Sequence, residues 1–313
     1  MPEPKLSVVL ATDTYATIRP VVDRFRQQSV RELLELVFVT PSAADFEASL
    51  EHREDFGAIK IVENSVDELS RARAAGVRAS TAEYVFIGET HSYPHPQLAE
   101  ALMQKFTGEW AIVMPAMTNG NPKTAVSWSG MLSDYGRWAE GLPEGEITYI
   151  PVYNAAFLRT ALLALGDRLD FVFGRGEELA AAFRNAGYKF YFQPSVTMDH
   201  LNVSPYGHWL VQRFASGMMI AGNRSRGWPL WRRAFYVLAS PMIPVVLWRR
   251  VFPGVRSSFR VSGWPVSTVL WITLGLTIRA FAEMLAYAGI PAAGSIRRNN
   301  EYELHKLAYT DLV

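Results

Sequence analysis

The chain has 313 residues, of which 49% are hydrophobic, so it can bury a substantial core and is not disordered as a whole. Its 31 Lys and Arg residues balance 30 Asp and Glu residues, which excludes a global attraction to nucleic acid or to an acidic surface. It contains no cysteine, which excludes disulfides, thiolate zinc sites and a cysteine nucleophile.

The first part of the chain alternates apolar, β-branched runs with segments of helical periodicity. The helical signal is clearest at Ile18, Val21, Val22 and Phe25, which follow the spacing i, i+3, i+4, i+7. The apolar runs are 6–12, 36–39, 58–62, 84–87 and 110–114. This alternation predicts an α/β fold with a mostly parallel, Rossmann-like sheet flanked by helices, which binds ligands at the carboxyl ends of its strands.

The pattern continues beyond these runs with one interruption. A capping-box sequence at 65–68 predicts the start of a helix, and a further helix is predicted at 98–106. Residues 118–145 contain Asn-Gly-Asn-Pro and Pro-Glu-Gly, which predict an inserted or mobile loop. Ordered structure is predicted to return at 149–153, with helices at 157–165 and 177–185 and a strand at 188–192.

Glu89 and His91 directly follow the strand predicted at 84–87. Alternate residues of an extended segment point to the same side, so both side chains can enter one site. A carboxylate with an imidazole suits Mn, Zn or Fe, whereas a lone carboxylate with phosphates suits Mg. His200, just beyond another predicted strand, is the candidate for a third ligand. The alternative from spacing alone is that Glu89 caps the following turn and His91 lies in solvent.

After about residue 200 the chain becomes rich in Trp, Arg, Pro and long apolar runs. The run 234–248 is interrupted by two prolines, and the run 266–288 carries Arg279 and Glu283. Because a membrane-spanning helix needs about 20 apolar residues, we prefer helices that lie in, or dip into, the membrane interface. The alternative is a buried helical subdomain or an interface between copies in a homo-oligomer. The expected interfacial anchors are Trp228, Trp231, Trp248, Trp264 and Trp271.

An arginine cluster opens this region and has two interpretations. It is interleaved with tryptophans, so it could bind the phosphates of a lipid-linked acceptor or anionic headgroups, although such clusters are usually solvated faces. The cluster consists of Arg224, Arg226, Arg232 and Arg233. The N-terminal residues lack the charged-then-apolar layout of a secretion signal, which favours the cytoplasmic face of the cell membrane.

Three stretches, taken in order, resemble a family 2 glycosyltransferase. They are LSVVLATDTYATIRPVVDRFRQQ, VDELSRARAAGVRASTAEYVFIGETHSYPHPQL and YNAAFLRTALLALGDRLDFVFGRGEELAAAFRNAGYKFYFQPSVTMDHLN. The resemblance covers about residues 5–202 and is more specific than any single motif. It implies a GT-A-like, nucleotide-sugar-binding catalytic domain over residues 1–202, followed by a helical, membrane-associated region over residues 203–313.

The resemblance also implies which residues bind the donor. The family's first strand ends in a turn that holds the nucleotide, and this turn corresponds to a stretch containing Thr12, Asp13 and Tyr15. A later helix start of the type Ala-Arg-Asn-x-Gly corresponds to 72–76 and places Arg73 near the donor phosphates. Glu89 would contact the donor through the metal that it holds.

The family's metal ligands and general base also have counterparts. The Asp-x-Asp metal motif aligns with Glu89-Thr90-His91, and the family's late histidine aligns with His200. These residues are therefore the implied ligands of a divalent Mn or Mg ion. The Glu-Asp pair that supplies the base is approximated by Glu177 and Glu178, either of which could serve. Without the resemblance, this pair would be interpreted as an acidic first helical turn.

Two departures from the family pattern bear on specificity. Glu-x-His replaces Asp-x-Asp, which leaves the choice of metal open. The aspartate that normally follows the second strand and reads the nucleotide base is missing from residues 39–42. The base of the donor therefore cannot be assigned from these residues.

Together, these features imply a metal-dependent, inverting glycosyltransferase that does not use nucleic acid. It would move a sugar from a nucleotide-sugar donor to a lipid-linked or surface-glycan acceptor at the membrane surface. One alternative is a non-catalytic, glycosyltransferase-like scaffold or binding protein at the membrane. Another is a polyprenyl-phosphate sugar synthase, which would be active only with a lipid phosphate acceptor.

Overall fold

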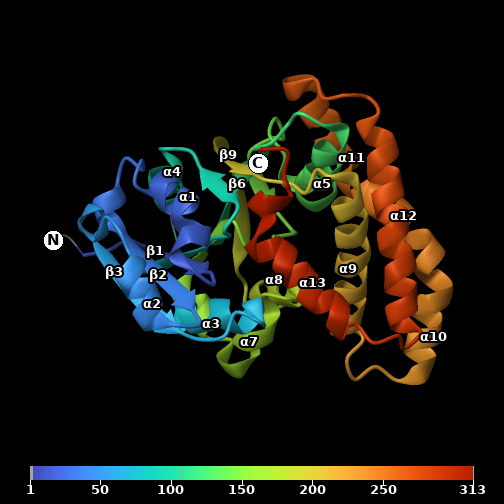
Figure 1. Ribbon diagram of the computed structural model, residues 1–313, viewed down its shortest axis with the longest axis horizontal. Helices are drawn as coiled ribbons and strands as arrows, with labels where there is room; N and C mark the ends of the chain where they lie inside the picture. The colour runs from blue at the N-terminus through green and yellow to red at the C-terminus, as the bar shows by residue number, and fades with distance from the viewer. Residues whose placement is uncertain (1–2, 107, 313) are drawn as a thin grey trace. The chain divides into compact units, whose positions relative to one another are not determined.

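The computed structural model describes residues 3–106 and 108–312. Contacts divide the chain into two compact units (Figure 1). The first comprises Met1–Ala116 and Pro143–Asp199, and the second comprises Met117–Leu142 and His200–Val313. The division into functional domains at residues 202 and 203 stays a prediction, but contacts place the segment 117–142 with the C-terminal helices.

The strands of the described residues form one nine-stranded sheet in the order β3-β2-β1-β4-β8-β6-β9-β5, with β7 paired to β9. β1 is parallel to β2 and β4, and β2 is parallel to β3, whereas β8 is antiparallel to β4 and β6. The predicted α/β class is confirmed, with a parallel N-terminal part and antiparallel additions. The strands are β1 Leu6–Ala11, β2 Leu34–Thr40, β3 Ala58–Glu63, β4 Tyr84–Ile87, β5 Ser92–Pro94, β6 Trp110–Asn119, β7 Gly145–Ile147, β8 Ala155–Leu158 and β9 Lys189–His200.

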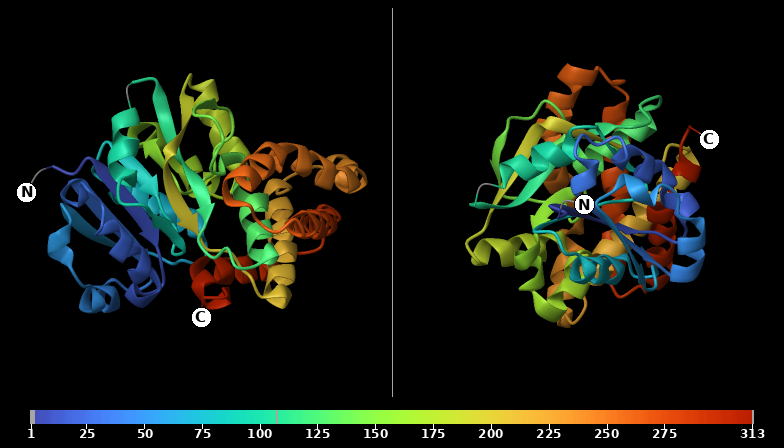
Figure 2. Two further views of the ribbon diagram at one scale, coloured as in Figure 1. Left: turned by 90° about the horizontal axis from the view of Figure 1, so that it is seen from above. Right: turned by 90° about the vertical axis from the view of Figure 1, so that its left-hand side faces the viewer.

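The parallel strands β1 and β2 are buried at every residue, as expected where helices cover both faces of a sheet. The strands β1 to β3 lie side by side with α3 packed against them (Figure 2). Gly76 of α3 makes this packing close, because a Cβ there would lie 2.4 Å from Cγ1 of Val9. Burial would raise the pKa of the Glu35 carboxyl in β2, but hydrogen bonds from Ser7, Thr81 and Lys60 hold it below its usual range.

The helices of the first unit follow the predicted periodicity, but two of them begin later than predicted. The helix predicted at 157–165 begins at Arg159, because Phe157 and Leu158 belong to β8. The four apolar positions predicted in the first helix are all buried in α1. The capping box at 65–68 does not open a helix. The Ser65 hydroxyl accepts from the Asp67 amide instead, and α3 begins at Leu69. The helices are α1 Tyr15–Phe25, α2 Ala43–Ser49, α3 Leu69–Ala79, α4 Leu98–Lys105, α6 Arg159–Leu163, α7 Leu169–Val172 and α8 Gly176–Asn185, with 3₁₀ turns η1 Arg31–Leu33, η2 Arg53–Asp55 and η4 Gly166–Arg168.

The second unit is helical and includes a helix inside the segment that was predicted to be a loop. The loop prediction for 118–145 is wrong at Ala125–Tyr135, which forms α5. The Thr124 side chain caps this helix by accepting from the Ser127 amide at 3.1 Å, a local signal that the Pro and Gly residues around it obscured. The other helices are α9 Tyr206–Arg224, α10 Leu230–Ala239, α11 Ile243–Ser262, α12 Thr268–Tyr287 and α13 Ala293–Leu304, with 3₁₀ turns η3 Gly136–Trp138, η5 Ser240–Met242 and η6 Lys306–Tyr309.

Small residues bring the helices of the second unit very close together. α9 and α12 run side by side (Figure 1), and a Cβ on Gly217 of α9 would lie 2.5 Å from the carbonyl oxygen of Arg279. The closest approach joins α11 to η3, where a Cβ on Gly254 would lie 1.4 Å from the carbonyl oxygen of Gly136. Since real Cβ atoms do not approach this closely, no side chain fits at Gly254 without a shift of the backbone.

Ion pairs compensate the buried charges of this unit. Both terminal nitrogens of Arg213 donate to the Asp134 carboxylate, at 2.8 and 2.6 Å. The buried carboxylate of Glu283 lies 3.0 Å from Arg279 and 3.7 Å from Arg224. Arg279 and Glu283 therefore form the i, i+4 pair that their spacing allows.

Two helical stretches of this unit are long and apolar enough to cross a membrane by length and composition alone, Leu230–Ser262 and Thr268–Tyr287. In the first stretch, 11% of the apolar 18-residue segment is buried, and in the second stretch 39% is buried. The first is also divided between α10, η5 and α11. The pattern is weak evidence for spanning, because a core helix of a globular protein passes the same test.

Candidate active site

Glu89, His91 and His200 come together at the ends of two strands. Glu89 and His91 follow β4, and His200 is the last residue of β9, a strand that belongs to the first unit through Asp199. One ligand-type atom from each residue lies within 4.8 Å of the others, and all three residues are at most 4% exposed. Nε2 of His91 is 3.5 Å from Oε2 of Glu89. The alternative that His91 lies in solvent is therefore wrong.

Two polar neighbours orient the Glu89 carboxylate. Its Oε2 accepts hydrogen bonds from the Ser92 hydroxyl at 2.9 Å and from Nδ2 of Asn154 at 2.6 Å. Asn154 has a left-handed φ of 58°, a conformation that Asn tolerates better than most residues. Its backbone N–H donates to the carbonyl oxygen of Ile87. Because this backbone bond ties Asn154 to the end of β4, the amide side chain is held beside Glu89.

A second amide fixes the tautomer of His200. Nδ1 of His200 lies 2.9 Å from Oδ1 of Asn202, and an amide oxygen can only accept, so Nδ1 carries the proton. The Asn202 amide cannot easily flip, since its Nδ2 donates to Oδ1 of Asn119 at 3.0 Å and to the carbonyl oxygen of His200 at 2.9 Å. This network leaves the lone pair of the neutral ring on Nε2, where it is available to a metal.

The donor set fits a divalent metal ion. Glu89 supplies a carboxylate oxygen, and His91 and His200 each supply an imidazole nitrogen. Both the burial of the group and the hydrogen bonds to Glu89 and His200 match the way that proteins orient metal ligands. Two imidazoles suit Mn, Zn or Fe better than Mg, which prefers oxygen ligands.

Arg73 on α3 is a buried cation that contacts an aromatic ring. It is 6% exposed, and its guanidinium lies 4.6 Å from the ring centroid of Tyr153. Among the described residues it forms no ion pair, and its Nε has no hydrogen-bond partner. A buried guanidinium without an acidic partner is costly. This arrangement can bind an anionic group such as a phosphate.

The turn after β1 is fixed by its own hydrogen bonds. The Thr12 amide donates to the carbonyl oxygen of Val39, and its hydroxyl donates to the carbonyl oxygen of Thr14. Oδ1 of Asp13 accepts from the Thr14 amide at 2.8 Å. β1 and β4 are parallel neighbours, so this turn and Glu89 lie at the same edge of the sheet.

Tyr15 is the first residue of α1, and it is only 4% exposed. Its ring meets that of Phe46 edge to face, with the ring centroids 5.7 Å apart. Burial raises the pKa of the Tyr15 phenol. Tyr15 is therefore a packing residue of the first unit, in contact with Phe46.

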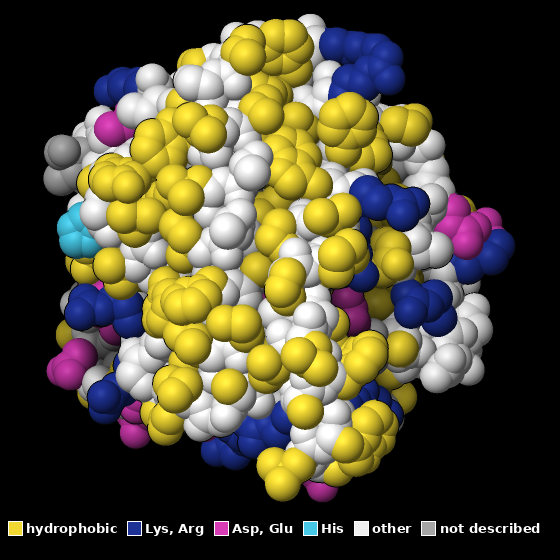
Figure 3. Space-filling model, turned by 90° about the vertical axis from the view of Figure 1, so that its right-hand side faces the viewer, with side chains coloured by type: hydrophobic (Ala, Val, Ile, Leu, Met, Phe, Trp, Pro, Cys, Tyr) yellow, Lys and Arg dark blue, Asp and Glu magenta, His cyan; other side chains and the backbone are white. Residues whose placement is uncertain are grey.

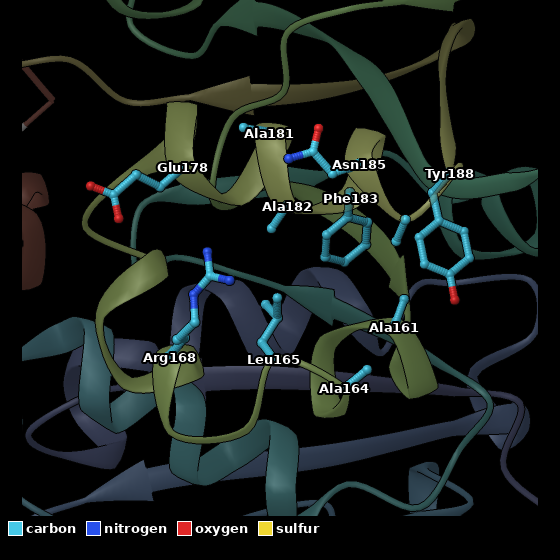
Figure 4. A pocket seen from close by; sticks show the side chains of 11 residues that line it. Ala161, Ala164, Leu165, Arg168, Glu178, Ala181, Ala182, Phe183, Asn185 and Tyr188 are labelled. Carbon is cyan, nitrogen blue, oxygen red and sulfur yellow. The ribbon is translucent and has the colours of Figure 1, made fainter.

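Glu177 and Glu178 lie in the first turn of α8 and are exposed. Glu178 pairs with Arg175 at 3.3 Å, and neither glutamate belongs to the group of three metal-type ligands. Glu178 lines a cavity of about 430 Å³, with Arg168 near it and Tyr188 at the opposite end (Figure 4). The structure thus brings together the three predicted metal ligands, and the role of Glu177 or Glu178 as the base stays a prediction.

Ser92, Tyr153 and Asn154 belong to the site but were not predicted from the sequence. Ser92 and Asn154 contact Glu89, and Tyr153 contacts Arg73. The available signal was the Tyr-Asn pair just before β8, since Asn is common at left-handed turns that begin or end strands.

No protein-family profile and no curated protein matches the sequence. Among solved structures, the chain is similar to the mannosyltransferase PcManGT from Pyrobaculum calidifontis, solved in complex with GDP-Man and Mn²⁺. The identity is 17%, the TM-score is 0.51, and the match covers 92% of this chain and 87% of that one. TarS 1–349 from S. aureus, in complex with UDP-GlcNAc, has 13% identity over 91% of each chain and a TM-score of 0.48. The chain therefore has the fold of the PcManGT glycosyltransferase.

Proposed function

We propose that this chain is a metal-dependent, inverting glycosyltransferase of the family 2 type. It moves a hexosyl group from a nucleotide-sugar donor to a lipid-linked or surface-glycan acceptor at the cytoplasmic face of the cell membrane. The observation that carries the proposal is the buried group of Glu89, His91 and His200 at a strand-end edge of the sheet. The fold shared with PcManGT, whose structure holds GDP-Man and Mn²⁺, supports the same conclusion.

Sugar transfer requires stabilisation of the diphosphate that leaves. Glu89, His91 and His200 would hold a divalent cation, and the chemistry that it supplies when bound is neutralisation of negative charge on phosphate oxygens. Two imidazole ligands favour Mn over Mg. Arg73 would bind a donor phosphate, because its buried charge lacks an acidic partner among the described residues.

The turn after β1 supports the nucleotide. Asp13 would contact the nucleoside, because the turn lies at the same sheet edge as Glu89, and the fully buried Thr12 would hold that turn through its hydrogen bonds. Tyr15 would shape that turn through its contact with Phe46.

The acceptor hydroxyl must lose a proton as it attacks the sugar carbon from the face opposite the diphosphate. A carboxylate within hydrogen-bond reach performs this role. Glu177 and Glu178, in the first turn of α8, are the candidates.

The test is a panel of UDP- and GDP-sugars supplied with Mn²⁺ or Mg²⁺ to the full chain, with and without a lipid phosphate acceptor. Release of nucleoside diphosphate and transfer of sugar are measured. We expect Glu89→Gln and His91→Gln each to reduce turnover by roughly 10³-fold. His95→Gln is the matched control, since His95 is a nearby histidine that follows β5 and is half exposed.

Three outcomes distinguish the alternatives. Turnover that survives both site substitutions contradicts the metal site. Nucleotide binding without turnover under every condition supports the non-catalytic scaffold. Activity that requires a lipid phosphate identifies a polyprenyl-phosphate sugar synthase.

A further inference from the structure

The second unit contains a long stretch of sequence with cations and no acids. Residues 200–282 include ten Arg and no Asp or Glu. Arg213, Arg224 and Arg279 pair within the unit with Asp134 or Glu283. The other seven are concentrated on α10, α11 and the turn before α10. They are Arg226, Arg232, Arg233, Arg249, Arg250, Arg256 and Arg260.

α10 presents an apolar stripe to the outside. Trp231, Phe235 and Leu238 follow the spacing i, i+4, i+7 and therefore lie on one face of α10, which Met242 of η5 continues at i+11. They are 73%, 62%, 82% and 58% exposed, and no residue of α10 is buried. The face of the helical unit seen in Figure 3 is broadly apolar, with Lys and Arg side chains around it. An apolar surface of this kind is normally covered by a partner.

α11 mixes cations with aromatic rings on its outer face. Arg249, Phe252, Arg256 and Phe259 follow the spacing i, i+3, i+7, i+10 and are all exposed. The opposite face, which includes Gly254, is buried against the unit. A guanidinium on the outward face of a helix is very unfavourable in hydrocarbon but can reach lipid phosphates from the interface. This pattern fits a helix that lies along a membrane and not one that crosses it.

α12 belongs to the bundle and is not an independent span. Its buried face packs on α9, and the Glu283 carboxylate on that face is paired with Arg279 and Arg224. Its outward residues include the exposed Leu270 and Phe281, which extend the apolar surface of α10.

We propose that the outer face of α10 and α11 lies in the headgroup region of a bilayer that contains anionic lipids, without crossing it. The stripe of α10 enters the acyl boundary, and the arginines of α11 contact lipid phosphates. Charge complementarity favours an anionic lipid surface, because α10 and α11 carry several Arg and no Asp or Glu, and such a face binds anionic headgroups and repels a second copy of itself. This proposal rests on the proposed location of the protein at the membrane. Its tests do not measure sugar transfer, so a failure of this proposal can be distinguished from a failure of the proposed enzymatic function.

The first experiment measures co-flotation of the full chain with vesicles of phosphatidylcholine, alone or with one third phosphatidylglycerol. We expect binding only to the anionic vesicles and its loss in high salt. The triple variant Arg249→Gln, Arg256→Gln, Arg260→Gln should bind roughly 100-fold more weakly. The matched control removes three exposed arginines of the first unit, Arg31→Gln, Arg53→Gln and Arg71→Gln, and should bind as the unmodified chain does.

Equal binding to neutral vesicles, or equal loss of binding in the control triple variant, overturns the role of the α11 arginines.

The second experiment compares the unmodified chain with Trp231→Phe for fluorescence quenching by lipids brominated at shallow or deep acyl positions. We expect the Trp231 contribution to be quenched from shallow positions. Resistance to alkaline extraction from membranes would indicate a crossing helix and overturn the proposal.

A third measurement addresses association between copies of the chain. Light scattering of the lipid-free chain in mild detergent is compared with that of Phe235→Ser. A stable dimer that this substitution dissociates, together with no vesicle binding, would assign the face to a homo-oligomer and overturn the proposal. A monomer that binds anionic vesicles supports it.

Discussion

The helical unit and the candidate site of the first unit treat buried charge in opposite ways. In the helical unit, Arg213 makes two hydrogen bonds to Asp134, and Glu283 lies between two arginines. In the first unit, Arg73 is similarly buried, its guanidinium lies against the Tyr153 ring, and it forms no ion pair among the described residues. Glu89 is accompanied by an imidazole and by the neutral donors Ser92 and Asn154.

This contrast distinguishes charges that hold the fold from charges that are available to a ligand. A compensated pair leaves no charge for a ligand and is destabilising to break. A buried cation without an acid, or a carboxylate next to metal-type nitrogens, marks a candidate binding site. Each prediction below breaks one side of the contrast or makes it sharper.

The largest effect is expected from breaking the compensated pair. Arg213→Met should reduce the free energy of unfolding by about 3 kcal/mol, because the Asp134 carboxylate is left without its cation. Urea unfolding measures this. The double variant Arg213→Met, Asp134→Leu should recover most of the loss, and a single variant as stable as the unmodified chain would contradict the assignment.

The next effect concerns the amide that positions His200. Asn202→Leu should weaken Mn²⁺ binding by roughly 10- to 100-fold, since Nδ1 of His200 loses the acceptor that fixes its tautomer. Titration calorimetry measures the affinity, and metal-free thermal unfolding reports any loss of packing separately. Asn202→Asp keeps an oxygen acceptor and should retain most of the affinity. If both variants bind Mn²⁺ normally, Asn202 has no positioning role.

Arg73→Met should have a smaller effect, on donor binding alone. We expect roughly tenfold weaker binding of a nucleoside diphosphate, from loss of one charged hydrogen-bond donor. Stability should be unchanged or slightly increased, because no acid is left unpaired among the described residues. Fluorescence titration and urea unfolding test the two parts, and marked destabilisation would indicate a structural role instead.

The smallest effect is a pH dependence of stability. Burial would raise the pKa of the Asp134 carboxyl, but the charge and hydrogen bonds of Arg213 hold it below its ordinary value of 3.8. A lowered folded pKa means that the pair stabilises the fold above the ordinary range of aspartate and less as the pH falls through the folded pKa. The stability gap between the unmodified chain and Arg213→Met should therefore narrow at acidic pH. A gap independent of pH would contradict this.

Local patterns predicted the scaffold well and the neighbours of the site poorly. The parallel strands could be predicted because β1 and β2 are continuous apolar runs. The resemblance selected Glu89, His91 and His200 as metal ligands, which the structure brings together, but their role stays a prediction.

The polar neighbours of the site could not be predicted. Asn154 reaches Glu89 across 65 residues of chain, and the amide of Asn202 meets that of Asn119 across 83. Hydrogen bonds between residues so distant in sequence leave no periodic signal. α5 was missed for a different reason, because the Gly and Pro residues around it dominate the local pattern.

The contact between Gly254 and Gly136 has a consequence for the protein's relatives. A Cβ at position 254 would lie 1.4 Å from the carbonyl oxygen of Gly136, so even alanine would force α11 away from η3. Because the clash is with the backbone of residue 136, it would occur whatever residue stands there, so related chains that keep this packing should retain glycine at 254. Glycine at 254 would then mark chains in which the helix bearing Arg249 and Arg256 packs against η3 in this way.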